Sequence, residues 1–164
     1  AGRDDQARRV GPGEVSRALE IQFVGAADVA LTVVSGSVRP TRPARGALGA
    51  LVGRQLGGLV AVVGLDVTVE EGYATARAVM LMIVASLKQF TGDLDRVERV
   101  VRLYGMVNGG PDFRDYPKVI DGASDFVYEL WGPEFGQHAR TAIGAGGLPH
   151  DIVVEINGEF EIAD

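Results

Sequence analysis

The chain has 164 residues, of which 46% are hydrophobic, and its 22 acidic and 16 basic side chains give a formal net charge of −6. This is the length of one domain with a sizeable core, and the acidic balance argues against a nucleic-acid binder, whose basic side chains must neutralise phosphates. The absence of cysteine excludes disulfides and thiolate chemistry, and 2 histidines are too few for a usual zinc site.

The mean hydropathy of +0.13 is high for a small monomer, which indicates that some apolar surface lies in a subunit interface. The first residues are polar and charged, so we expect no signal peptide and a cytoplasmic protein. Neither a metal nor a cofactor is expected.

The N-terminal third of the chain has weak signals. Residues 1–15 are charged and contain glycine and proline, which predicts a mobile lead-in to a single domain over 16–164. Alternating residues over Leu19–Phe23 predict a half-buried strand, and a second strand is expected over Val29–Val34. Two prolines make 39–43 a loop.

Residues 44–64 form a glycine-rich stretch, and its mostly apolar part from 47 to 64 is nearly long enough for a membrane span. Arg54, Gln55 and several glycines argue against a span. A loop that leads into a buried strand at Leu59–Val63 fits the pattern better.

The clearest element is a helix that begins after Thr68. Thr68 and Glu71 form a capping box, in which each side chain satisfies a backbone amide at the helix start. Gly92 is expected to end the helix as a C-cap. Apolar residues at steps of three and four predict a buried face made of Val69, Tyr73, Ala76, Met80, Ile83 and Leu87.

A central strand is expected over Val97–Val107, and a second helix over Tyr116–Trp131, ended by Gly132 and Pro133. Two further strands are expected at 138–146 and 151–162. The second helix is expected to bury Val119, Ala123, Phe126 and Leu130. One parity of the last strand is apolar, at Ile152, Val154, Ile156, Phe160 and Ile162.

This order of elements predicts an α+β fold, with a single mixed sheet of five to six strands. Two helices are too few to cover both faces of such a sheet, so we expect them to pack on one face. An open second face predicts self-association.

Two charged residues near the C-terminus are the best candidates for a site. Arg140 offers a fork of donors that grips a carboxylate, and we expect Glu155 on a neighbouring strand to lie close to it. Arg140 could instead form an ordinary ion pair at a strand edge, and Glu155 could simply occupy the polar side of its strand. His138 shares a strand face with Arg140, as a structural residue or at the border of a pocket.

Three segments carry a resemblance to a known family: VNGGPDF at 107–113, YPKVIDGASD at 116–125 and GQHARTAIGAGGLP at 136–149. They resemble the RidA/YjgF family of reactive-intermediate deaminases. The resemblance implies a chorismate-mutase-like fold and a homotrimer with sites at its subunit interfaces. It assigns the substrate carboxylate to Arg140 and the backbone at Ala142, and the hydrolytic water to Glu155.

Asp121 departs from the family pattern, because many relatives carry asparagine there. A charged aspartate could interact with Arg140 across the subunit boundary and compete with an anionic substrate; otherwise it is a solvated helix position. As an anion partner or competitor, Asp121 belongs to the expected substrate site.

Other departures concern the expected pocket. Met82 and Asn157 replace an asparagine and a glutamate that are common in relatives, and Gly109 and Gly110 replace a Ser-Ala pair. The pocket tyrosine of relatives is missing, since no tyrosine precedes Tyr73. The resemblance is strong over 66–162 and weak over 1–65, and the 44–64 segment could reshape the pocket entrance.

The first functional hypothesis is a cofactor-independent deaminase that hydrolyses enamines and imines to ammonia and a 2-keto acid. The second is an enzyme of the same fold that acts on another carboxylate-bearing intermediate of a dedicated, for example biosynthetic, pathway. The third is a non-catalytic metabolite-binding trimer. Ribonuclease activity, described for some relatives, fits the acidic charge poorly. We expect a small-molecule carboxylate as the partner, and neither nucleic acid nor membrane.

Overall fold

The computed structural model of the protein describes residues 17–24, 28–33 and 61–163. Its strands form one mixed sheet in the order β2-β1-β5-β3-β4, in which β3 and β4 run parallel and the other neighbours antiparallel. The strands are β1 (Arg17–Val24), β2 (Asp28–Val33), β3 (Val97–Asn108), β4 (Ala139–Ala145) and β5 (Val154–Ile162).

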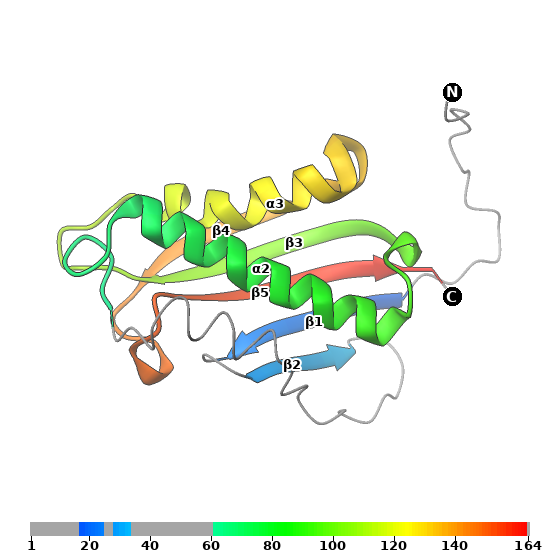
Figure 1. Cartoon of the computed structure of the whole chain (residues 1–164), viewed down its shortest axis with the longest axis horizontal. Coiled ribbons are helices and arrows are strands. Elements are labelled where there is room, and N and C mark those ends of the chain that lie inside the picture. The colour runs from blue at the N-terminus through cyan, green and yellow to red at the C-terminus, as the bar shows by residue number, and fades with distance from the viewer. Residues whose placement is uncertain (1–16, 25–27, 34–60, 164) are drawn as a thin grey trace.

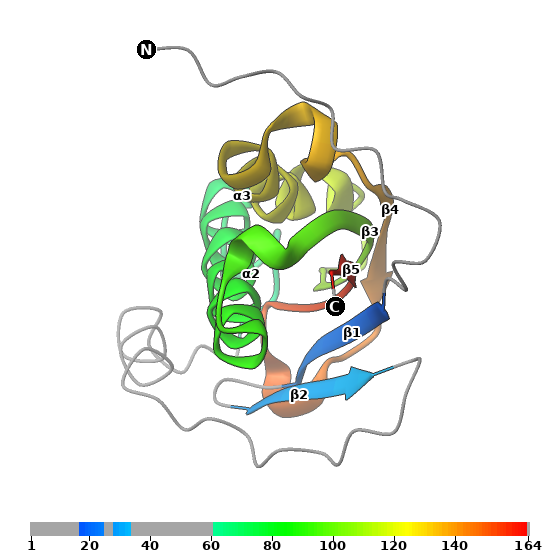
Figure 2. The ribbon, with the colours of Figure 1, turned by 90° about the vertical axis from the view of Figure 1, so that its right-hand side faces the viewer.

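Two helices, α2 (Val69–Thr91) and α3 (Tyr116–Gly136), lie side by side on one face of the sheet (Figures 1 and 2). α3 lies over β3 and β4, and α2 lies over β5 and β1. This confirms the predicted α+β arrangement of a mixed sheet with two helices on one face. Within the described ranges, no helix is long and apolar enough to cross a membrane.

The start and end of α2 follow from its capping residues. The Thr68 hydroxyl accepts a hydrogen bond from the Glu71 amide at 3.2 Å, and the Glu71 carboxylate accepts one from the Thr68 amide at 2.9 Å. This is the predicted capping box. Gly92 has φ +80°, and its amide donates to the Lys88 carbonyl, which ends the helix as expected. Ala76, Met80, Ile83 and Leu87 of the predicted face are fully buried.

α3 extends beyond its predicted end. Gly132 takes φ +72°, a conformation that strains other residues, and the chain then resumes helical geometry to Gly136. Pro133 fits because it starts the resumed turn, where its missing amide costs little. Val119 and Ala123 are buried as predicted, whereas Leu130 is 42% exposed. The prediction for Leu130 is wrong because the buried face follows Val119, Ile120, Ala123 and Val127.

The core lies between the helices and one face of the sheet. β3 buries Val100, Leu103 and Val107 toward the helices, as the predicted central strand should. β5 does the same with its apolar parity, which includes Ile156 and Phe160. The opposite face of the described sheet has no helix over it and exposes Ile143 of β4 by 39%.

Some of the remaining expectations concern residues that the structure describes, and others lie outside them. β1 and β2 occupy the predicted positions within one or two residues, and a 3-10 turn at Pro149–Asp151 makes β5 begin later than expected. Ala61 and Val63 are buried, but the described end of the strand expected at Leu59–Val63 forms only isolated bridges at Val63. The lead-in at 1–15, the loop at 39–43 and most of 44–64 lie outside the described residues.

Because α2 and α3 approach each other closely at Gly122, a single methyl group added there should destabilise the protein. A Cβ at Gly122 of α3 would lie 2.1 Å from the Tyr73 carbonyl oxygen of α2. We expect Gly122→Ala to lower the free energy of unfolding by about 2 kcal/mol or more, despite the better helix propensity of alanine. Denaturant unfolding measures this. Gly146→Ala, with no atom within 4 Å of its added Cβ, is the matched control, and equal midpoints for both variants would contradict the prediction.

Candidate functional site

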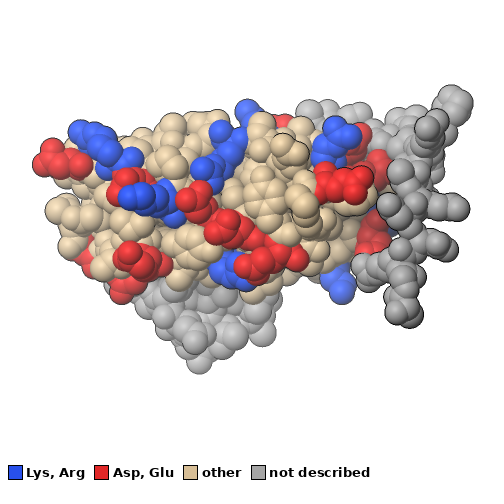
Figure 3. All heavy atoms as spheres, turned by 90° about the horizontal axis from the view of Figure 1, so that it is seen from above, with Lys and Arg blue, Asp and Glu red and all other residues tan. Residues whose placement is uncertain are grey.

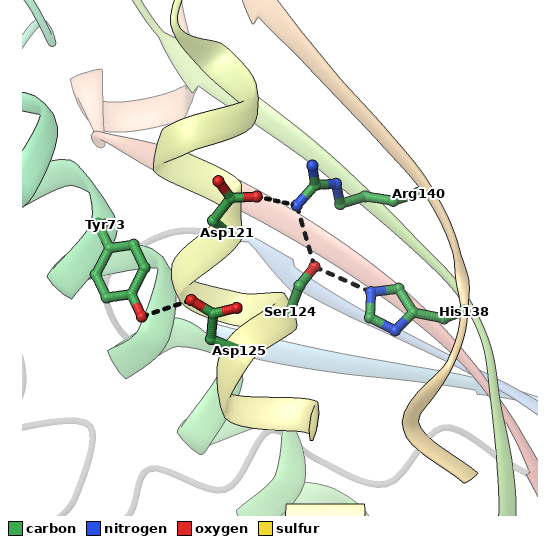
Figure 4. Close-up of polar contacts among 6 residues, drawn as sticks. All are labelled: Tyr73, Asp121, Ser124, Asp125, His138 and Arg140. Atoms are coloured by element: carbon green, nitrogen blue, oxygen red, sulfur yellow. Dashed lines mark hydrogen bonds and ion pairs between the residues drawn. The ribbon is translucent and has the colours of Figure 1, made fainter. Parts of the chain in front are cut away.

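Arg140 lies on β4, at an edge of the described sheet, and points toward α3. A Cβ at Gly144 of the same strand would lie 2.4 Å from the Tyr116 side chain of α3, so this parity of β4 faces the helix. Residues two apart on a strand point to the same side, which places Arg140 on that face. Figure 4 shows its side chain reaching from β4 to α3.

Asp121 of α3 is the ion-pair partner of Arg140. The Nη1 group of Arg140 donates to Oδ1 of Asp121 and, at 3.3 Å, to the Ser124 hydroxyl. The Arg140 and Asp121 side chains are 29% and 43% exposed, so the pair is open to solvent on one side. The predicted contact between these residues exists, but it forms within one chain and not across a subunit boundary.

Ser124 and His138 continue this polar chain into the protein. His138 Nδ1 lies 2.6 Å from the Gly136 carbonyl oxygen, and a carbonyl only accepts, so Nδ1 carries the proton. Nε2 is then an acceptor for the Ser124 hydroxyl, 3.0 Å away. Arg140 thus donates to Ser124, and Ser124 donates to His138, as Figure 4 shows. His138 in turn donates to the Gly136 carbonyl, so the hydrogen bonds all run in one direction.

The pKa of His138 is lowered from its ordinary value. Burial is the main cause, since it disfavours the charged imidazolium, and the positive charge of Arg140 acts in the same direction; the Gly136 carbonyl opposes them in part. A neutral imidazole is the form that accepts from Ser124. His138 therefore fixes the orientation of the hydroxyl that Arg140 contacts.

Ser124 was not among the residues expected from the sequence. It lies three residues after Asp121, a spacing that places both side chains on one face of a helix. His138 and Arg140, two residues apart, share a face of the facing segment. Combining the two spacings would have suggested the cluster, whereas a single buried serine in a helix carries no signal.

Ala142 lies two residues beyond Arg140 and packs partly against the core. β4 pairs with β3 on one side, and within the described residues its other edge has no strand beside it. Alternate backbone amides on that edge are available to a ligand or to another chain. The expected backbone contact at Ala142 stays a prediction.

Glu155 lies on the opposite face of the sheet. It is 5% exposed and sits on β5 opposite Met106, in the parity that points away from the helices. β3 separates β5 from β4, so the expectation that Arg140 and Glu155 lie on neighbouring strands is wrong for a single chain.

The strand register gives the size of this separation. Arg140 is in register with Leu103 of β3, and Glu155 with Met106, three residues further along. Two strand spacings and three residues correspond to about 10 Å in each direction. Because the two side chains also leave opposite faces, one chain cannot bring them onto one small ligand.

The other departures from the family pattern are spread over the fold. Met82 is 6% exposed in the hydrophobic core beneath α2. Asn157 lies on the face of Glu155, and its buried Oδ1 has no hydrogen-bond partner in the described part of the protein. His138 also borders a hollow of about 630 Å³ that is lined in addition by Arg99, Val100, Val101, Gln137, Ala139 and Glu161.

Histidine and carboxylate side chains do not cluster in threes among the residues that the structure describes. The polar chain from Asp121 to His138 has one carboxylate and one imidazole, and the positive Arg140 lies between them. Groups of this kind have the capacity to bind an anion and to position a proton.

Two helices on one face of a mixed sheet, with an arginine held between α3 and β4, define a chorismate-mutase-like α+β protein. The sequence profile of the family described as "YjgF/chorismate mutase-like, putative endoribonuclease" matches residues 16–157. The chain belongs to this family, and the resemblance seen in its sequence is confirmed.

One relative matches a smaller part of the chain. This chain is 43% identical to Protein TCP17 of Trypanosoma cruzi over 99 residues, which correspond to 60% of this chain and 62% of TCP17. The chain therefore spans less than two thirds of that relative.

Two solved structures share the fold. A protein described as a putative endoribonuclease from Shewanella oneidensis MR-1 has a TM-score of 0.60 and 35% identity, over 62% of this chain and 67% of its own. Atu1372 of Agrobacterium tumefaciens, described as having unknown function, has a TM-score of 0.61 and 28% identity, over 86% and 80%.

The buried position of His138 predicts a pH dependence of stability. Its folded pKa is below the ordinary value of 6.5, so the unfolded state binds more protons as the pH falls through 6.5. We expect the free energy of unfolding to be undiminished above this pH and to fall below it, until the folded pKa is reached. His138→Gln should remove this part of the dependence. NMR titration of the His138 ring tests the cause, and a midpoint at or above 6.5 would contradict it.

Proposed function

We propose that the protein is a cofactor-independent hydrolytic deaminase of reactive enamine and imine intermediates, which releases ammonia and a 2-keto acid. The observation that carries this proposal is the presentation of Arg140 at a sheet edge. Its Nη1 group is held by Asp121 and Ser124, while Nη2 and Nε take part in no hydrogen bond with the described residues. A guanidinium held in this way can grip a substrate carboxylate.

Glu155 is the proposed acid–base group. It would take a proton from water as the oxygen adds to the C=N carbon, and would pass that proton to the nitrogen. The resulting carbinolamine then loses ammonia as its C–N bond breaks and the carbonyl forms. A buried carboxylate is suited to such transfers, because its position is fixed before the reaction.

A homotrimer resolves the separation of Arg140 and Glu155. We propose that each site takes Arg140 and the Ala142 backbone from one subunit and Glu155 from the next. The helix-free face of the described sheet supports this, since it carries the exposed Ile143. Association over this face would cover that apolar side chain.

A second candidate is a repurposed enzyme, or a non-catalytic binder, for another carboxylate-bearing metabolite. The ion pair between Asp121 and Arg140 favours it, because a carboxylate already occupies part of the guanidinium. Endoribonuclease activity, which is named for the family and for the Shewanella relative, fits the net charge of −6 of this chain poorly. Acidic and basic side chains alternate over the face seen in Figure 3, which gives no continuous basic surface there for a nucleic-acid backbone. A cytoplasmic location remains part of the proposal.

The deaminase is tested by ammonia release from imino acids generated in situ from several amino acids. We expect the wild-type protein to accelerate release, Arg140→Ala to abolish the gain, and Glu155→Gln to reduce the rate by about a hundredfold or more. Arg77→Ala removes an equal charge from an exposed ion pair with Glu129 and is the control. If the folded wild-type protein leaves the rate unchanged, the chemistry is different and the second candidate stands.

The proposed trimer is tested by light scattering coupled to size exclusion. We expect a mass of three chains for the wild type and a smaller species for Ile143→Asp, since a carboxylate in an apolar interface is strongly unfavourable. Leu81→Asp is the matched control, because Leu81 of α2 has a similar exposure, 41%, and lies on the helix side. A monomeric wild type, or equal dissociation by both variants, would exclude this interface.

A further inference from the structure

The ion pair between Arg140 and Asp121 leaves hydrogen-bonding atoms unused on both side chains. Both contacts of Arg140 use Nη1, and the contact of Asp121 uses Oδ1. Among the residues that the structure describes, Oδ2 of Asp121 and Nη2 and Nε of Arg140 have no hydrogen-bond partner. The side chains remain 43% and 29% exposed, so a small ligand can reach them.

The available groups lie on the same side of the pair. Figure 4 shows the second oxygen of Asp121 and the second terminal nitrogen of Arg140 both directed away from Ser124, on the outer sides of the two atoms that form the ion pair. Ser124, held by His138, fixes Nη1 from the opposite side. The protein thus presents a cation and an anion side by side, each with unused hydrogen-bonding capacity.

We propose that this pair recognises a zwitterion: a 2-iminium acid, with its carboxylate on Nη2 of Arg140 and its N-protonated nitrogen donating to Oδ2 of Asp121. In such a ligand the two charges are separated by two bonded carbon atoms. They can therefore meet the two neighbouring charges of the protein simultaneously, with each of the four groups next to its opposite.

A ligand that is only an anion fits this site less well. Its carboxylate would gain the attraction of Arg140 but would lie beside the negative charge of Asp121, and like charges at this distance repel. An asparagine at position 121 would keep a hydrogen bond to Nη1 without that repulsion. The aspartate therefore selects for a ligand with a positive charge next to its carboxylate.

This inference rests on the proposed deamination, and it narrows the substrate to the protonated form of the imine. A protonated C=N carbon is the better acceptor for water, because the nitrogen already carries the charge that it must otherwise gain in the reaction. Asp121 would stabilise the reactive species while it is bound. Asp121 would then determine specificity, in addition to its structural contact with Arg140.

Binding of two stable probes tests the proposal directly. 2-Aminobutyrate is a zwitterion, and 2-hydroxybutyrate has the same carbon skeleton with the carboxylate alone. By calorimetry we expect the wild type to prefer 2-aminobutyrate, and Asp121→Asn to lower that preference by about tenfold, the effect of one charged hydrogen bond. Asp125→Asn is the matched control, because Asp125 lies one turn further along α3 and contacts Tyr73 at 2.8 Å instead.

Each outcome decides the question. A preference that is equal in wild type and Asp121→Asn, or wild-type protein that binds neither probe, overturns the zwitterion site. If Asp121→Asn fails to fold by thermal unfolding, Asp121→Ser, which also removes the charge, replaces it in the comparison. Ammonia release without the preference would leave the deaminase and remove this inference. The preference without ammonia release would leave the recognition site and remove the deaminase.

Discussion

The structure depends on how closely α3 approaches β3 and β4. Glycines make this approach possible: a Cβ at Gly105 would lie 2.5 Å from Ile120, and one at Gly144 would lie 2.4 Å from Tyr116. Side chains at these positions would lift the helix from the sheet. With the helix in place, Asp121 and Ser124 reach Arg140, so the geometry of the polar cluster follows from the packing beneath it.

The two faces of the sheet carry different groups. The helix side buries the core and holds Arg140 in a hydrogen-bond chain with a fixed direction. The other side carries Glu155, whose burial at 5% exposure on a face without a described helix is unusual for a carboxylate. The proposed chemistry has one charged group on each face of the sheet, and for that reason the proposal requires assembly.

The sequence was most informative where interactions are local. The capping box at Thr68 and the glycine cap at Gly92 depend on neighbouring residues, and both were predicted correctly. Gly132 misled the prediction because a glycine at a helix end and a glycine in a helix kink have the same local pattern. Leu130 was misplaced for a related reason, since the buried stripe of α3 is set by the sheet below it.

The sequence predicted only part of the polar cluster and of its geometry. Arg140 and Asp121 do interact, but the order of strands that separates Arg140 from Glu155 depends on pairing between distant segments. Nothing in the periodicity of β5 shows that β3 lies between it and β4. Ser124 was missed, and the role of His138 was left open, because their contact arises only when α3 and β4 face each other.

The polar cluster also has a short span along the chain. Its members all lie between residues 121 and 140, whereas β1 pairs Arg17 with Ile162 at the far end. Contacts of small sequence separation form early in folding, because little chain entropy is lost in closing them. The β3-α3-β4 unit should therefore form the contacts of Arg140 with Asp121 and Ser124 before the N-terminal strands pair with the sheet. Substitutions in the first part of the chain can then accumulate during evolution without changing the position of Arg140.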